Sequence, residues 1–282
     1  MIQTLHVASP AKLNLFLHIT GRRENGYHEL QTIFQLIDLC DELSFQYNED
    51  DLIQIKGLDH VELENNLIYR AAMQLKPFRQ HGTMGCHIQL KKTIPMGAGL
   101  GGGSSNAATT LLVLNQLWQC QLSKTQLMDI ASKLGADVPI FVSGHNAWAE
   151  GIGEKITPLY SLPKKRYIIL KPDCFISTQS LFSQKTLTRD SKPSKFAAYQ
   201  DNPSNFGNNF EPLARQLYPA VEQAFQYLNQ YGQAKLTGTG ACVFIEIADD
   251  LDTTKILKQA PCTVYVAHSL NHSPVLDYVN AL

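Results

Sequence analysis

The chain lacks the surplus of basic residues that a nucleic-acid partner would require. Its 282 residues carry 24 lysines and arginines against 25 aspartates and glutamates, a formal net charge of −1. A protein that neutralises many phosphates usually has a clear basic excess. The composition therefore argues against nucleic acid. It predicts that any anionic ligand is attracted locally, by a few side chains and backbone N–H groups.

A secretory leader and a long apolar run are also missing. Residues 1–7 show no basic segment followed by an apolar stretch, which a signal peptide would have. Residues 93–123 contain no charged side chain, but Pro95, several glycines and many polar residues interrupt them. Because a membrane span needs roughly 20 mostly apolar residues, we expect no membrane partner and a cytoplasmic protein. A monomer and a homodimer are both compatible with the sequence.

The six cysteines include no pair of the C-x-x-C type that binds metals or does redox chemistry. They lie at positions 40, 86, 120, 174, 242 and 262. Three disulfides are numerically possible. Free, buried thiols in a reducing cytoplasm are the better interpretation, because the chain is long and has no leader.

Alternating and amphipathic segments in the first half predict a mixture of strands and helices. Residues 13–18 alternate between leucine and other residues, which is typical of a strand. Asn66 and the capping box Ser123–Gln126 mark helix starts, and Gly135 marks a helix end. Further strands are expected at 43–47, 52–55 and 86–90, and helices at 66–76, 106–118 and 123–134.

The composition changes near residue 158, where we place a domain boundary between residues 1–158 and 159–282. Residues 186–209 are polar and contain two prolines, so we expect a long, mobile loop there. Around this loop we expect a strand at 167–170, two helices separated by Pro219, a strand at 243–247, one more helix and a strand at 263–267. That order resembles an α/β sandwich of the ferredoxin type.

The most informative segment is a glycine-rich loop between the strand at 86–90 and the helix that follows, Pro95-Met-Gly-Ala-Gly-Leu-Gly-Gly-Gly-Ser-Ser-Asn-Ala107. Consecutive glycines let the backbone approach a ligand closely and adopt positive φ without steric cost. Inward-pointing N–H groups at the start of a helix form an anion site. Ser104 and Ser105 are each able to cap that helix, bind a phosphate oxygen or hold a metal ion. The loop therefore predicts a nucleotide triphosphate site.

Other glycine-rich patterns fit this loop less well. Residues 97–102 match G-x-G-x-x-G, but no strand ending in an acidic residue follows about 20 residues later, as a dinucleotide site requires. An ATPase P-loop needs a lysine after its glycines, and none is present here. A flexible linker is disfavoured because strong strand and helix patterns flank the loop directly.

Taken together, four segments resemble the GHMP kinase superfamily. They are Ser9–Leu17, the glycine loop, Gly135-Ala-Asp-Val-Pro139 and a second glycine loop, Leu236-Thr-Gly-Thr-Gly-Ala-Cys242. The resemblance covers nearly the whole chain and is weakest at 186–209. Ala98 lies where the family often has glycine, a change that puts little in doubt because one methyl group is able to point away from the phosphates.

This resemblance implies an α+β, two-domain GHMP kinase fold. An N-terminal mixed α/β domain with a left-handed βαβ crossover would be followed by a C-terminal ferredoxin-like α/β sandwich, with the active site in the cleft between them. The implied cofactors are ATP and Mg²⁺. Within the superfamily, Pro10–Asn14, Gly26–His28 and Leu134–Pro139 resemble the kinases that act on a small-molecule, cytidine-diphosphate-linked polyol in the non-mevalonate route to isoprenoid precursors. Homoserine or mevalonate kinase specificity is the alternative.

The resemblance assigns catalysis to Asp137 and Lys12. A carboxylate that takes the proton of the attacking hydroxyl is typically worth about 10²–10⁴-fold, and a nearby ammonium keeps it ionised and stabilises the developing alkoxide. From local sequence alone, Asp137 is equally explained as a turn or capping residue, and Lys12 as a solvent-facing lysine on an edge strand. Asn14 lies two residues further along, on the same side of the strand as Lys12.

Other residues are assigned to the two substrates. The expected ATP-binding residues are Asn66, Pro95, Met96, Gly97, Ala98, Gly99, Leu100, Gly101, Gly102, Gly103, Ser104, Ser105, Thr239 and Gly240, with Ser105 also contacting Mg²⁺. The expected acceptor-binding residues are Asn14, Tyr27, His28, Phe182 and Thr237. Tyr27 and Phe182 would form an aromatic sandwich around cytosine, and His28 would hydrogen-bond its edge. Helix capping explains Asn66 equally well, and a place in the core explains Phe182 equally well.

Two further classes of protein remain as alternatives. A non-enzymatic nucleotide sensor would keep the glycine loop but would need neither Lys12 nor Asp137. A dehydrogenase would bind NAD(H) in place of ATP.

Overall fold

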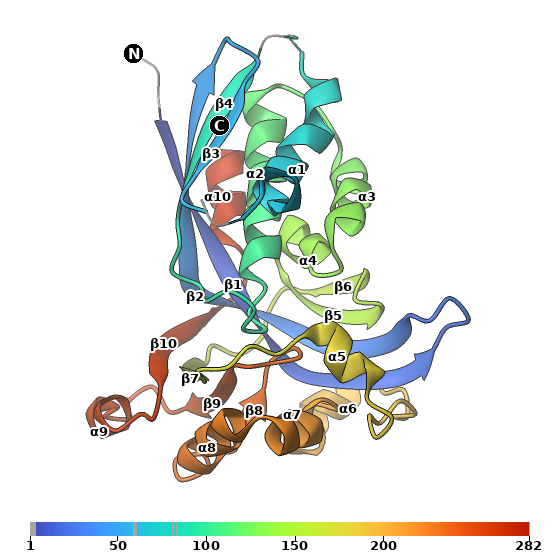
Figure 1. The fold of residues 1–282 in the computed structure, drawn as a ribbon, viewed down its shortest axis with the longest axis vertical. Helices are drawn as coiled ribbons and strands as arrows, with labels where there is room; N and C mark the ends of the chain where they lie inside the picture. The colour runs from blue at the N-terminus through green and yellow to red at the C-terminus, as the bar shows by residue number, and fades with distance from the viewer. Residues whose placement is uncertain (1–3, 59–60, 81, 83, 282) are drawn as a thin grey trace.

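The computed structural model describes residues 4–58, 61–80, 82 and 84–281, and it has two lobes joined by long strands (Figure 1). The first three residues of the N-terminal segment discussed above lie outside this range. The strands are β1 Thr4–Arg22, β2 His28–Asn48, β3 Ile53–Lys56, β4 Gly85–Lys91, β5 Asn146–Gly151, β6 Lys155–Leu159, β7 Arg166–Lys171, β8 Lys235–Leu236, β9 Val243–Ile247 and β10 Thr263–Leu270. The α-helices are α1 Leu67–Leu75, α2 Gly102–Leu117, α3 Lys124–Leu134, α4 Val138–Ser143, α5 Thr178–Ser183, α6 Phe196–Asp201, α7 Glu211–Leu217, α8 Pro219–Leu228, α9 Thr254–Lys258 and α10 Pro274–Asn280.

Strands β1 and β2 form a long antiparallel hairpin that runs through both lobes (Figure 1). Both strands are much longer than the short strands that the sequence patterns predict. Residues 31–37 of β2 are buried in an unbroken run, so elements cover both faces of the strand there. A strand covered on both faces shows no alternation of polar and apolar residues, and the pattern of this part therefore contained no strand signal.

The sheet continues from one lobe into the other, in the order β3-β4-β2-β10-β7-β9-β8. In the first lobe β3 and β4 pair in parallel, with α1 in the connection. In the second lobe β10, β7, β9 and β8 pair antiparallel. The bridge is short, because β10 pairs with β2 through Ser269 and Leu270 only. The strands thus join two lobes that each have their own core.

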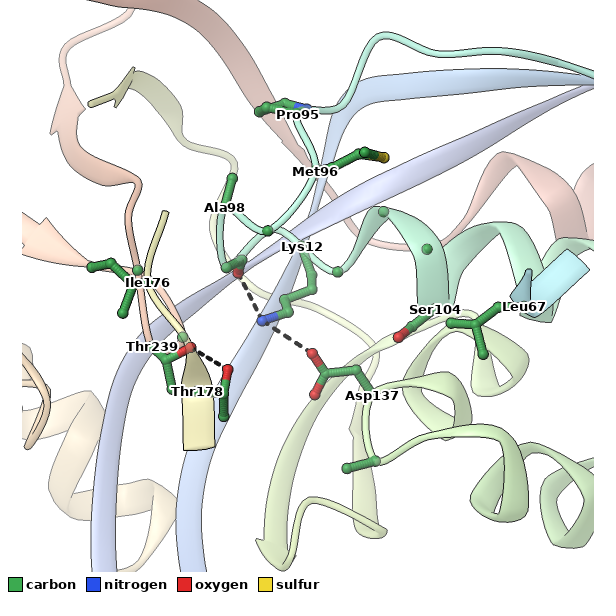
Figure 2. Close-up of a pocket in the computed structure, with 18 of the residues that line it drawn as sticks. Lys12, Leu67, Pro95, Met96, Ala98, Ser104, Asp137, Ile176, Thr178 and Thr239 are labelled. Carbon is green, nitrogen blue, oxygen red and sulfur yellow. Dashed lines mark hydrogen bonds and ion pairs between the residues drawn. The ribbon is translucent and has the colours of Figure 1, made fainter. Parts of the chain in front are cut away.

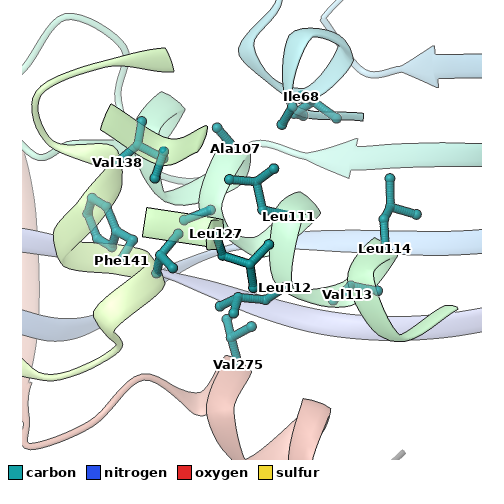
Figure 3. Close-up of a cluster of buried hydrophobic side chains, with 14 of the residues drawn as sticks. Ile68, Ala107, Leu111, Leu112, Val113, Leu114, Leu127, Val138, Phe141 and Val275 are labelled. Carbon is teal, nitrogen blue, oxygen red and sulfur yellow. The ribbon is translucent and has the colours of Figure 1, made fainter. Parts of the chain in front are cut away.

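The first lobe is built around α2, whose residues 105–114 are all buried (Figure 3). Helices α1, α3 and α4 pack against it, and Val275 of α10 reaches the same core. The second core lies between α7, α8 and the β7–β9 strands, and it also includes Leu17 and Ile19 of β1. The boundary at residue 158 stays a prediction, and both α10 and the hairpin pack across it.

Residues 186–209, where a long loop was expected, are helical in part. This segment contains α6 and a short 3-10 helix, Pro203–Asn205. Phe206 is buried in a small core with Phe16, Ile33 and Trp148, and Phe196 packs against it. Two aromatic residues therefore hold a segment whose polar composition indicated only a loop.

Other local expectations are confirmed. Asn66 caps α1 by accepting from the Ile68 N–H at 2.9 Å, and Ser123 and Gln126 form the capping box of α3. The six cysteines are free. Burial raises the pKa of Cys86 to about 12, so that thiol stays protonated at neutral pH. In the part of the chain that the structure describes, no helix is long and apolar enough to span a membrane.

Asp41 of β2 is a fully buried carboxylate that joins the sheet to the entrance of the glycine loop. It accepts hydrogen bonds from Lys92 Nζ at 2.6 Å, from the N–H groups of Thr93 and Ile94 at 2.8 Å each, and from Asn106 Nδ2 at 3.0 Å. One side chain thus fixes the segment before the loop and the helix after it.

We expect Asp41→Asn to lower the free energy of unfolding by about 3 kcal/mol, because the partly buried Lys92 ammonium loses its counter-ion and the buried cluster loses an acceptor. Urea denaturation measures this change. Asp38→Asn is the matched control, since Asp38 is an exposed carboxylate whose side-chain partner is His268, at 2.9 Å. The control is expected to cost less than about 1 kcal/mol, and equal costs for the two variants would contradict the assigned role of Asp41.

Candidate active site

A cavity of about 800 Å³ lies between the lobes and contains most of the predicted site residues (Figure 2). One end is lined by the region around the start of α1, and the other by α5 and the second lobe. Its lining includes Lys12, Asn14, Leu17, Leu30, Asn65, Asn66, Leu67, Pro95, Met96, Gly97, Ala98, Gly99, Gly101, Gly102, Gly103, Ser104, Asp137, Phe175, Ile176, Thr178, Phe182, Gly238, Thr239 and Gly240.

The glycine loop turns its carbonyl groups toward the scaffold. The Ala98 carbonyl accepts from the Cys242 N–H at 3.2 Å, and the Leu100 carbonyl accepts from the Lys12 N–H at 3.0 Å. The Gly99 carbonyl accepts from Lys12 Nζ at 2.9 Å and from Thr237 Oγ1 at 3.1 Å. In a trans peptide the next N–H points the opposite way. The N–H groups of residues 99–101 therefore point away from the scaffold, as an anion site requires.

The loop ends directly in the positive end of α2. Gly101 is the N-cap residue at φ +71°, and no side chain caps the helix. The first N–H groups of a helix have no partner within it, so in the described structure those of α2 remain available to an anion. The helix begins four residues earlier than expected, and Ser104 and Ser105 lie inside it and do not cap it.

This earlier start corrects the assignment of Ser105. Its hydroxyl is fully buried and hydrogen-bonds Ser9 Oγ at 2.7 Å. It does not line the cavity, and the predicted contact of Ser105 with ATP or Mg²⁺ is not supported. Ser104 lines the cavity, on the side of α2 that faces Asp137 (Figure 2). Leu100 likewise points into the core and not into the cavity.

Lys12 is buried, with 3% of its side chain exposed, and its ammonium group has three protein partners. It donates hydrogen bonds to Asn14 Oδ1 at 2.6 Å and to the Gly99 carbonyl at 2.9 Å, and it forms an ion pair with Asp137 Oδ2 at 3.3 Å (Figure 2). A solvent-facing lysine is therefore excluded. The ammonium is held in one position, between the glycine loop and the carboxylate.

Asp137 has one carboxylate oxygen on Lys12 and the other without a protein partner in the described structure. It occupies the N-cap position of α4 but makes no capping hydrogen bond, so the interpretation as a capping residue is wrong. Its side chain is 35% exposed to the cavity side. A carboxylate that is fixed at one oxygen and free at the other is suited to accept a proton.

Asn14 and Thr237 position Lys12 and the loop. Asn14 Oδ1 accepts a hydrogen bond from Lys12 Nζ, and Asn14 Nδ2 donates one to Thr32 Oγ1 at 2.9 Å. Both ends of the amide therefore have a partner. Thr237 Oγ1 accepts from the Asn14 N–H at 3.0 Å and donates to the Gly99 carbonyl. Thr237 is buried and does not line the cavity, so it joins the two glycine loops and does not touch the acceptor.

The predicted aromatic sandwich is not formed. Phe182 lines the cavity, but its ring stacks on His28 with centroids 4.6 Å apart. Tyr27 is 59% exposed and does not line the cavity. The structure therefore brings His28 and Phe182 together, and Tyr27 lies outside the cavity.

Two family descriptions match the chain. "GHMP kinases N terminal domain" matches residues 66–145, and "GHMP kinases C terminal" matches residues 194–267. The 4-diphosphocytidyl-2-C-methyl-D-erythritol kinase of Acinetobacter baumannii is 68% identical over 274 residues, which cover 97% of this chain and 98% of that protein. The chain belongs to the GHMP kinase family. It is a small-molecule kinase that uses ATP.

Other relatives agree with this assignment. The kinase of the same name from Acinetobacter baylyi is 64% identical over 277 residues, covering 98% of this chain and 99% of that protein. A crystal structure of 4-(cytidine 5'-diphospho)-2C-methyl-D-erythritol kinase superposes with a TM-score of 0.81 at 29% identity, covering 94% and 99% of the two chains. A mevalonate kinase from Methanococcus jannaschii shares the fold, with a TM-score of 0.71 at 17% identity over 96% and 99% of the chains. The predicted two-domain GHMP kinase fold is confirmed.

Arg189, which contacts His28 outside the cavity lining, had no signal in the sequence patterns. Its Nε donates to His28 Nε2 at 3.1 Å, and its other nitrogens bind the carbonyls of Phe182, Gln184 and Leu187. Because arginine only donates, His28 Nε2 accepts, and the proton of the neutral ring lies on Nδ1. Burial, followed by the charges of Arg189 and Arg22, lowers the pKa of His28.

The residues that the structure describes contain no cluster of three or more histidine, cysteine or acidic side chains that would hold a metal ion by themselves. The side-chain oxygen groups that line the cavity beside α2 include the hydroxyl of Ser104 and the carboxylate of Asp137. This donor set fits an ion that keeps most of its ligands as waters and phosphate oxygens, which is the preference of Mg²⁺.

Proposed function

We propose that this kinase transfers the γ-phosphoryl group of ATP to the C2 hydroxyl of 4-diphosphocytidyl-2-C-methyl-D-erythritol, giving the 2-phosphate and ADP. The observation that supports this most is the position of Asp137. Its uncommitted carboxylate oxygen lies in the middle of a cavity that has the glycine loop on one side and the His28–Phe182 pair beyond the other end. High identity to kinases named for this substrate agrees with the proposal.

In the proposed reaction Asp137 takes the proton of the C2 hydroxyl as the hydroxyl oxygen attacks the γ-phosphorus and the bond to ADP breaks. Lys12 holds the other carboxylate oxygen and stabilises the negative charge that develops on the attacking oxygen. Phosphoryl transfer depends mainly on such positioning and charge stabilisation. The two hydrogen bonds of Lys12 and its ion pair with Asp137 mean that little reorganisation is needed at the moment of reaction.

The N–H groups of the glycine loop and of the first turn of α2 would bind the phosphates of ATP. The end of the cavity near Asn66 and Leu67 would take the adenosine. Mg²⁺, when bound, would neutralise phosphate charge, and the oxygens of Ser104 and Asp137 would be available to hold it. Thr239, which hydrogen-bonds Thr178 at 2.9 Å across the cavity, would close over the phosphates.

At the other end, the Nδ1–H of His28 would donate to an acceptor atom on the cytosine edge. Phe182, already stacked on His28, would offer a ring face to the base only if a side-chain rotation exposed it. The alternative specificities for homoserine or mevalonate would have no use for either residue.

Steady-state ADP release tests the proposal. The acceptors are 4-diphosphocytidyl-2-C-methyl-D-erythritol, mevalonate and homoserine, each with ATP and Mg²⁺. We expect saturable turnover with the cytidine-linked acceptor alone. Turnover only with mevalonate or homoserine would overturn the proposed acceptor, and ATP binding without turnover of any acceptor would indicate a nucleotide sensor.

We expect Arg189→Gln to raise KM for the cytidine-linked acceptor by roughly 10-fold, the equivalent of one charge-assisted hydrogen bond, and to leave KM for ATP unchanged. The variant removes the hydrogen bond that fixes the tautomer of His28, and it removes a positive charge that lowers the pKa of His28. Steady-state kinetics from about pH 5 to 8, the range in which histidine titrates, measures both effects. In the wild type, protonation places a hydrogen on His28 Nε2, where it opposes the Arg189 guanidinium and displaces the ring. The acceptor affinity is therefore expected to fall only below about pH 6.5, the ordinary histidine value.

In Arg189→Gln this loss at low pH is expected to be smaller, because no guanidinium opposes the protonated ring of His28. Lys195→Gln, in the same segment, is the control and should leave the pH profile unchanged. A wild-type pH profile in Arg189→Gln would contradict the role assigned to Arg189.

A further inference from the structure

A second cavity, of about 940 Å³, lies in the second lobe and shares no lining residue with the first. One wall is the β7–β9 face of the sheet, and the opposite wall is the α6 segment that the sequence had indicated as a loop. Phe196 and Tyr199 contribute ring surface from α6, and Leu15 contributes aliphatic surface from β1. The cavity is therefore part of the folded protein and has an apolar body.

Lys235 gives this cavity a positive charge without a close counter-ion. Its Nζ donates only to the carbonyls of Leu15, Pro203 and Phe206, each at 3.4 Å, which is long for such a bond. In the described part of the chain no ion pair within 4.0 Å involves this nitrogen. Burial lowers the pKa of Lys235, against the opposing charges of Glu246 and Glu211. A partly buried ammonium with weak partners is costly unless something else binds it.

Two phenol groups line the same cavity as Lys235. The hydroxyls of Tyr167 and Tyr199 have no hydrogen-bond partner among the described residues. Burial raises the pKa of Tyr199 to about 12, with a further contribution from Glu246, so the group is a donor at neutral pH. Glu246 is paired with Lys165 at the rim. The polar groups of the cavity thus include the weakly partnered Lys235 ammonium and two hydroxyl donors, beside the side chains of Gln200 and Gln233.

We infer that this cavity is a second small-molecule site, which binds an organic phosphate through Lys235, Tyr167 and Tyr199 and packs its apolar body against Phe196 and Leu15. An ammonium and hydroxyl donors in one cavity suit an oxyanion. The cavity has the size of a ligand site, and its walls combine ring surface with polar side chains.

The site lies directly behind the catalytic residues. Asn14 lines the first cavity and Leu15, the next residue of β1, lines the second, so successive side chains of this strand face the two cavities. The ligand would nevertheless bind without displacing ATP, because the lining residues are different.

Phenyl phosphate is the probe, and tryptophan fluorescence is the readout. Trp148 lies 6.3 Å from the Phe196 ring, whereas Trp118 is buried in the other core. We expect a saturable fluorescence change in the wild type that persists at saturating ATP. Lys235→Met is expected to weaken binding about tenfold or more, as the loss of a charged hydrogen bond would. Lys258→Met, on exposed α9, is the charge-matched control and should bind as the wild type does.

Tyr199→Phe, which removes one donor and keeps the ring, provides a second variant if Lys235→Met does not fold, and a severalfold loss is expected. Unchanged affinity in the variants, loss of the signal with ATP, or no saturable change with phenyl phosphate up to about 10 mM would each overturn the inference. Because the readout is binding and not turnover, its failure is distinct from a failure of the proposed kinase reaction.

Discussion

Asp137→Asn is expected to lower kcat by about 10²–10⁴-fold, the usual contribution of a positioned general base. KM for ATP should change little, because the adenosine end of the cavity is formed by other residues. The side chain makes no capping hydrogen bond, so the fold should be retained. Single-turnover kinetics with saturating ATP and acceptor, together with a thermal melt, measures both outcomes.

Asp173→Asn is the matched control, since Asp173 is a fully exposed carboxylate and its replacement should leave kcat unchanged. Lys12→Met removes the ion-pair partner of Asp137 and is expected to lower kcat by a similar factor. Residues that act as a unit are strongly non-additive, so the double variant should be no slower than the worse single variant. Retention of more than about a tenth of kcat by Asp137→Asn would remove Asp137 from the mechanism.

Gly99→Ala is expected to destabilise the protein by at least about 2 kcal/mol and to lower kcat/KM by roughly 10²-fold. Gly99 has φ +76°, and a Cβ there would lie 2.2 Å from the Thr237 carbonyl oxygen. Relief of this clash requires the two glycine loops to separate. That movement withdraws the Gly99 carbonyl from Lys12 and misplaces the phosphate site.

Gly103→Ala is the control within the same loop and helix. Its Cβ would meet only Leu67 Cδ1, at 3.6 Å, and its φ is not in the left-handed region. Because alanine favours a helix over glycine by up to about 1 kcal/mol, this variant should be at least as stable as the wild type in urea denaturation. Equal stability of Gly99→Ala and Gly103→Ala would show that the loops are not packed as described.

The parts of the site that depend on nearby residues could be predicted from the sequence. Helix caps at Asn66 and Ser123 follow from bonds that span two or three residues. The shared side of Lys12 and Asn14 follows from the two-residue period of a strand. The contact of Lys12 with Asp137 joins distant segments, and only the resemblance to a family indicated it.

The errors have identifiable physical causes. Glycine and serine have low helix propensity, so the start of α2 was placed at residue 106, whereas packing in the first core extends the helix back to Gly102. On a helix each residue turns by about 100°, and the earlier start decides that Ser104 faces the cavity and Ser105 faces Ser9. Arg189 was missed because its bond to His28 spans 161 residues and its segment is polar.

The most direct test of the central claim is a ³¹P NMR time course with the purified protein, ATP, Mg²⁺ and 4-diphosphocytidyl-2-C-methyl-D-erythritol. The account predicts one new phosphomonoester resonance that grows in step with ADP while the diphosphate signals of the acceptor persist. It also predicts that Asp137→Asn slows this growth by about 10²–10⁴-fold. ADP formation without a phosphomonoester on this acceptor, or a wild-type rate in Asp137→Asn, would contradict it.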